Sequence, residues 1–125
     1  MRKVHLFAED FGHESFISAL IKAVSHSMDE CVEVESLSVR GGHGTVISEF
    51  KQYLRDLERG ARKMPSFLVV ATDANCQKYS QRERQIIEAS EKFSHLVVPA
   101  VADPHIERWL LVDSAAFKQA LGKGC

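Results

Sequence analysis

The chain has 125 residues, of which 45% are hydrophobic, and its formal net charge at pH 7 is −1. This size supports one core and argues against two, so we expect a single domain over residues 1–125. The near-neutral charge excludes a broad basic surface for nucleic acid or an anionic membrane, so any such binding must be local. Widely spaced cysteines and the lack of a membrane-length apolar run predict a cytoplasmic protein with no membrane contact.

The apolar pattern predicts four strands, at 4–8, 32–39, 67–71 and 96–101. The second strand alternates polar and apolar residues, as is typical of a sheet edge. Four helices are expected between and after them, at 16–24, from 43 to about 60, at 80–93 and at 105–121. Ser80 is the expected N-cap of the third helix. The chain stops soon after the last predicted helix, which leaves open whether the natural protein extends beyond Cys125.

Alternation of strands and helices predicts an α/β fold, specifically a three-layer α/β/α (Rossmann-like) domain with a mostly parallel sheet of about four strands. Ligands of such sheets bind beyond the carboxyl ends of the strands. Carboxylates follow three of the four predicted strands, at Glu9, Asp73 and Asp103. Their oxygens suit Mg²⁺ or Mn²⁺. The alternative is a purely structural role, in which Asp73 and Asn75 form an Asx-turn and Glu9 is a solvated or capping acid.

Three segments in order resemble the Toprim superfamily, and together they cover most of the chain. The segment "HLFAEDFGHESFISALI" resembles the opening strand, acid and helix of Toprim domains. "FLVVATDAN" stands where that superfamily carries Asp-x-Asp. "VADPHIERWLLVD" resembles a segment of small uncharacterised Toprim-like proteins related to OLD nucleases, some of them associated with phage defence. The resemblance implies a Toprim-like domain.

The resemblance also implies a metal-dependent nuclease that hydrolyses phosphodiester bonds in nucleic acid. Glu9 and Asp73 would be catalytic and would hold Mg²⁺ or Mn²⁺, with Asn75 at the second acidic position of Asp-x-Asp. Asn75 supplies no charge, so Glu107 is the expected additional ligand, with Asp103 as another candidate. Where the family has a glycine after its glutamate, this chain has Asp10, which would add charge or cap the first helix. A non-catalytic metal- or nucleic-acid-binding or protein-interaction module is the alternative.

Three basic side chains are candidates for binding a substrate phosphate. Arg82 and Arg84 follow Asn75 closely, and His43 lies in the glycine-rich stretch "GGHG" at the start of the second predicted helix. Arg82 and Arg84 could instead pair with acids of their own helix. No H-x-x-x-H or H-E-x-x-H pair occurs, which argues against a zinc enzyme. Whether the chain forms a homodimer or binds a partner protein stays open at this stage.

Overall fold

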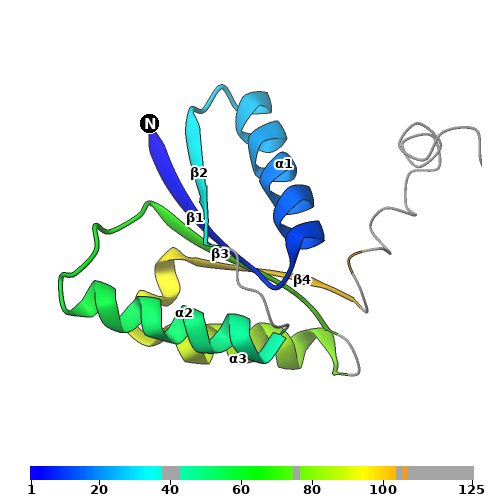
Figure 1. Ribbon diagram of the computed structural model, residues 1–125. Coiled ribbons are helices and arrows are strands. Elements are labelled where there is room, and N and C mark those ends of the chain that lie inside the picture. Colours follow the sequence, from blue (N-terminus) through cyan, green and yellow to red (C-terminus); the bar gives the residue numbers. More distant parts are fainter. Residues whose placement is uncertain (38–42, 75–76, 104–105, 107–125) are drawn as a thin grey trace, which may run out of the picture.

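The computed structural model describes residues 1–37, 43–74, 77–103 and 106 (Figure 1). Its elements in chain order are β1 (Arg2–Ala8), α1 (Phe11–Ser27), β2 (Val32–Ser36), α2 (His43–Glu58), β3 (Phe67–Asp73), α3 (Tyr79–Ser90), the 3₁₀ helix η1 (Glu91–Leu96) and β4 (Val97–Ala102). Of the predicted helix at 105–121, only Ile106 belongs to the described residues. Among the described helices, none is long and apolar enough to cross a membrane.

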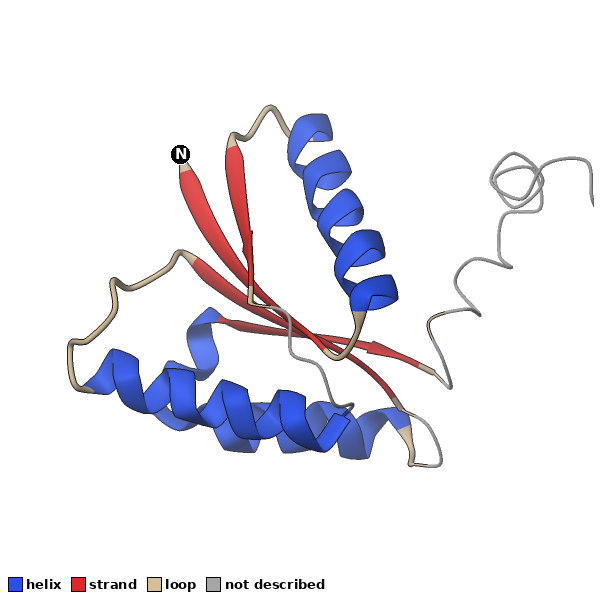
Figure 2. Cartoon of the chain, in the orientation of Figure 1, coloured by secondary structure: helices blue, strands red, loops and turns tan. Residues whose placement is uncertain are grey.

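The four strands form one sheet in the order β2-β1-β3-β4, and every neighbouring pair is parallel. Helix α1 lies on one side of this sheet, whereas α2 and α3 lie together on the other (Figure 1, Figure 2). The predicted α/β fold with a Rossmann-like, four-stranded parallel sheet is confirmed. Strand β2 is at an edge, as its alternating sequence predicted. Because all strands run the same way, their carboxyl ends meet at one edge of the sheet.

The core has two parts, one on each side of the sheet. On the α2 and α3 side, Phe50, Leu68 and Ile86 are fully buried. On the α1 side, Ile17 packs with Leu6 and its neighbours in the strands. Alternate residues of each strand face opposite sides of the sheet, which explains why β1 is apolar over residues 6–8 and β3 over residues 67–71. Because β1 and β3 are packed on both sides, the residues at their carboxyl ends have a fixed position.

Several details of the predicted helix at 80–93 were wrong, since α3 ends at Ser90 and the 3₁₀ helix η1 follows it. The N-cap of α3 is Lys78 and not Ser80. The Lys78 N–H faces the Gln81 Oε1 at 3.4 Å, and this contact lets the helix begin earlier. Ile87, an apolar residue of the same predicted helix, is 37% exposed. Its neighbour Ile86 is buried instead. Successive residues of an α-helix are rotated by about 100° about the helix axis, so Ile87 points away from the core.

Candidate metal centre

Glu9 stands directly after β1 and beside the end of β3. Its backbone N–H donates to the carbonyl of Ala71 at 3.3 Å, which continues the β1–β3 pairing one residue past the strand. The Thr72 hydroxyl donates to Glu9 Oε2 at 2.9 Å. The side chain of Glu9 is 10% exposed. Glu9 is therefore an oriented carboxylate at the edge of the core and not a freely solvated one.

Asp10 is the N-cap of α1, one of the two roles that its position suggested. Its Oδ1 accepts the backbone N–H of His13 at 2.9 Å, as N-cap carboxylates commonly do. The same oxygen lies 2.8 Å from Nδ1 of the His13 ring. One carboxylate thus starts the helix and sets the orientation of the imidazole in its first turn.

His13 is 1% exposed and joins the ends of the two central strands. Its Nε2 lies 2.9 Å from Asp73 Oδ1 and 3.6 Å from Glu9 Oε1. One ligand atom from each of these three residues can be chosen so that all lie within 4.8 Å of one another. Ligands about 2.1 Å from a common ion lie roughly 3.0–3.5 Å apart at octahedral or tetrahedral angles. The separations from His13 Nε2, 2.9 Å to Asp73 and 3.6 Å to Glu9, lie within about 0.1 Å of this range.

The protonation of the cluster reflects these contacts. Burial disfavours a charged His13, but hydrogen bonds to the carboxylates of Asp10 and Asp73 outweigh it, so the pKa of His13 is raised. Burial raises the pKa of Glu9 despite the opposing hydrogen bond from Thr72. Burial would also raise the pKa of Asp10, yet its hydrogen bonds with His13 lower it. Without an ion, a proton on His13 thus supplies positive charge among three acids.

Asp73 also receives a hydrogen bond from the chain beyond β4. The backbone N–H of Ile106 donates to Asp73 Oδ1 at 2.7 Å, and Ile106 is buried. Glu107, an expected ligand, directly follows Ile106 in the sequence, but it lies outside the described residues, as does Asn75. Asp103, the other acid considered, is exposed. The structure thus brings together Glu9 and Asp73 of the predicted ligands.

The predicted phosphate-binding residues have different surroundings. Arg82 is 7% exposed, and its Nη1 donates to Gln85 Oε1 at 3.2 Å. It shares the inward face of α3 with Ile86, four residues later, which explains its burial. Arg84 is exposed on the same helix. His43 is the first residue of α2, and its side chain lies outside the described part of the chain.

The sequence prediction missed His13. Closely spaced pairs of histidines are a common sequence signal of a metal site, whereas the observed cluster combines one histidine with carboxylates. A usable signal was present, since Glu9 and His13 are four residues apart and Asp10 precedes His13 by three, the spacing from N-cap to N3. With Asp10 as the N-cap, His13 lies in the first turn of α1, close to the carboxyl end of β1. Only packing decides whether it reaches a second strand.

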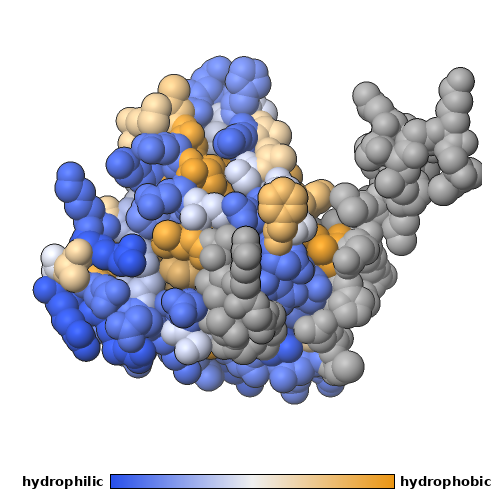
Figure 3. All heavy atoms as spheres, viewed as in Figure 1, coloured by the Kyte–Doolittle hydropathy of each residue, from blue (hydrophilic) through white to orange (hydrophobic). Residues whose placement is uncertain are grey.

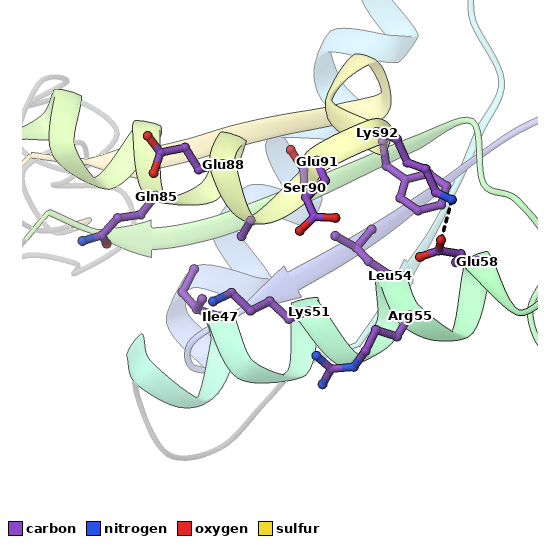
Figure 4. Close-up of a pocket in the computed structure, with 12 residues that line it drawn as sticks. Ile47, Lys51, Leu54, Arg55, Glu58, Gln85, Glu88, Ser90, Glu91 and Lys92 are labelled. Carbon is purple, nitrogen blue, oxygen red and sulfur yellow. Dashed lines mark hydrogen bonds and ion pairs between the residues drawn. The ribbon is translucent and has the colours of Figure 1, made fainter.

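A deep cavity lies elsewhere in the described part of the chain. It has a volume of about 750 Å³ and lies between α2 and α3, with the Lys92–Glu58 ion pair at one end (Figure 4). Lys51 and Arg55 extend from α2, and Glu88 from α3 (Figure 4). Acids and bases are mixed around an apolar floor, and the cavity contains none of the cluster residues. Size alone is therefore a poor guide to the chemistry of this molecule.

Comparison of the chain with protein-family models, with curated proteins and with solved structures found no match.

Replacing Asp10 with alanine is expected to lower the free energy of unfolding by about 1 to 2 kcal/mol, the usual cost of losing an N-cap. The pKa of His13 is expected to fall as well, because one of its two carboxylate partners is lost. Urea denaturation and NMR titration of the imidazole measure the two effects. Glu30→Ala is the control, since the Glu30 side chain is exposed and its carboxylate lies 3.5 Å from Arg2. Equal costs for the two variants would contradict the capping role.

Proposed function

We propose that this protein is a divalent-metal-dependent enzyme that hydrolyses phosphodiester bonds in nucleic acid. The supporting observation is the convergence of Glu9, His13 and Asp73 at the carboxyl edge of the sheet. Two carboxylates and one imidazole suit Mn²⁺ at least as well as Mg²⁺, because a nitrogen ligand favours the transition metal. The Toprim resemblance supports the same class of reaction, as does the expected contribution of Glu107.

The surroundings of His13 fit a metal ligand. Metal-binding histidines usually donate their other ring nitrogen to a carboxylate, which fixes the ring. In His13, Nδ1 is hydrogen-bonded to the carboxylate of Asp10, and Nε2 therefore faces Asp73 and Glu9. When His13 loses its proton, the Nε2 lone pair is directed at the point between the two acids. The same acids then carry an unbalanced negative charge that attracts a cation.

Each residue has a distinct role in the proposed reaction. A bound divalent ion would neutralise charge on a phosphate and lower the pKa of a water molecule. Asp73 and His13 would hold that ion. Glu9 has a raised pKa and keeps Oε1 on the His13 side while Oε2 accepts from Thr72, so it is suited to take a proton from water. Arg84, which is exposed, remains our proposed contact for the substrate phosphate, together with Arg82 and His43.

A nuclease assay tests this proposal. Single- and double-stranded DNA and RNA are incubated with the protein and Mn²⁺ or Mg²⁺, and then with a chelator. We expect cleavage that requires the metal and that falls at least about 100-fold in Asp73→Ala, since a ligand is lost. Asp56→Ala is the control, because Asp56 lies on α2 and pairs with Arg62. Cleavage by Asp73→Ala at the wild-type rate would rule out this function.

A second candidate is a Toprim-like module without catalysis. It is favoured by the hydrogen bonds that satisfy His13 on both ring nitrogens without any ion. Asn75 in place of an acid points the same way, because it leaves the site with less charge. Calorimetric titration with Mn²⁺ and Mg²⁺ separates the two: no binding at millimolar metal would support the module and contradict the enzyme.

A further inference from the structure

The cavity between α2 and α3 has the features of a ligand-binding site of its own, and it shares no residue with the metal centre. Its volume of about 750 Å³ lies within the usual range of ligand pockets, roughly 300–1,000 Å³. The floor is apolar and includes Leu54, which is 6% exposed, and Phe93, which is 9% exposed. In the view of Figure 3, the surface over α2 is largely hydrophilic, which agrees with a recessed apolar floor.

The charged groups beside this floor are sorted by sign (Figure 4). Lys51 and Arg55 come from α2 on one wall, whereas Glu88 and Glu91 come from α3 and the start of η1 on the other. The side chains of Lys51, Glu88 and Glu91 form no hydrogen bond or ion pair within the described part of the chain. Arg55 donates to the neutral Gln52, at 2.8 Å from Nη2 to Oε1. Positive and negative groups therefore line opposite walls without pairing across the cavity.

The backbone of Glu91 is strained at the same place. Its φ is 47° and its ψ is −120°, the conformation of the first central residue of a type II′ turn, where glycine is strongly preferred. The turn ends α3 and carries the chain to Lys92, whose Nζ lies 2.6 Å from the carboxylate of Glu58 on α2. Strained residues are concentrated at binding sites, where the side chain has a use. The carboxylate of Glu91 at a position that favours glycine therefore points to a binding role.

We propose that this cavity binds a small zwitterion with an apolar body, namely an amino acid or a short peptide with apolar side chains. The ligand carboxylate would pair with Lys51 and Arg55. The ligand ammonium group would pair with Glu88 and Glu91, and the apolar side chains would cover Leu54. A ligand with only one charge would leave one wall unpaired, whereas a zwitterion satisfies both. Because hydrogen bonds between charged groups are strong, the two ends would orient the ligand across the cavity.

Calorimetric titration in the presence of a chelator tests the proposal independently of the metal centre. The probes are leucine and leucyl-leucine, and the controls are leucyl-leucine with its amino group acetylated or its carboxyl group amidated. Loss of either charge should weaken binding at least about tenfold, since a hydrogen bond to a charged group is lost. Tighter binding of leucine would assign the site to amino acids, and tighter binding of the dipeptide would assign it to peptides. Equal affinity of the free and blocked dipeptides, or no binding of either probe at millimolar concentration, would overturn the proposal.

Replacing Lys51 with methionine tests the positive wall. Methionine keeps much of the apolar stem and removes the charge, so the affinity for the better probe should fall at least about tenfold. Lys63→Met is the control, because Lys63 is exposed and lies outside the cavity. Wild-type affinity in Lys51→Met would contradict the proposed contact with the carboxylate.

Replacing Glu91 with glycine separates binding from folding. Glycine adopts a positive φ without strain, so the urea midpoint should rise, while the affinity for the probe should fall because the carboxylate is lost. Asp29→Gly is the matched control, since Asp29 is the other described non-glycine residue with a positive φ, at 54°, and lies outside the cavity. It should leave binding unchanged. If Glu91→Gly bound the probe as tightly as the wild type, the negative wall would have no role and the proposal would fail.

Discussion

Replacing His13 with alanine is expected to abolish Mn²⁺ binding and to lower the free energy of unfolding by about 3 to 5 kcal/mol near pH 6, the typical cost of breaking a buried ion pair. The imidazole faces Asp10, Asp73 and Glu9, and it is 1% exposed. Its removal leaves the buried carboxylates of Glu9 and Asp73 without their cation and deprives the proposed site of its nitrogen ligand. Calorimetric titration and urea denaturation measure the two losses separately.

The pH dependence of this cost has a definite sign. The pKa of His13 is raised in the folded state, so the folded protein binds the proton more tightly than the unfolded chain does. The resulting stability is fully present below the unfolded pKa of about 6.5 and is lost as the pH rises through the folded pKa. In metal-free buffer, the difference between wild type and His13→Ala should therefore shrink from pH 6 to pH 9.

His26→Ala is the matched control for this experiment. His26 lies on the same helix, in its last turn, and is exposed. Its removal should cost less than about 1 kcal/mol, the range of a charge near a helix end, and should leave Mn²⁺ binding unchanged. If His13→Ala and His26→Ala behaved alike, the buried cluster would be ruled out as both a stabilising and a metal-binding feature.

Replacing Phe50 with alanine is expected to lower the free energy of unfolding by about 3 to 5 kcal/mol, the usual cost of a large cavity in a core. Phe50 is fully buried on α2, and its ring meets that of Phe7 edge to face with centroids 5.6 Å apart. Phe7 belongs to β1, the strand that leads to Glu9. The substitution thus removes the packing that ties α2 to the strand carrying the site.

Denaturation with urea, monitored by circular dichroism, measures the loss. Phe11→Ala is the matched control, because Phe11 is 78% exposed at the start of α1. It should cost no more than about 0.5 kcal/mol, as is usual for surface substitutions. A cost below about 1.5 kcal/mol for Phe50→Ala would show that the α2 side of the sheet is less tightly packed than its burial indicates.

The order of elements and the acidic carboxyl edge followed from the sequence. Strands covered on both sides read as apolar runs, and helices repeat their apolar residues every three to four positions, so both patterns are local. Glu9 and Asp73 were identifiable because a parallel sheet brings the ends of its strands to one edge. The stop of α2 was likewise predictable from Gly60, which adopts a positive φ of 74°.

Only the tertiary structure decided which side chains meet at that edge. His13 joins Asp73 because the first turn of α1 packs over the end of β3, 60 residues away in sequence. Burial of Arg82 depends on the rotation of α3 about its axis, which helical periodicity defines only approximately. Such relations arise from the packing of whole elements, and no short stretch of sequence contains them. The sequence by itself determined where the acids stand, and packing determined that a histidine stands among them.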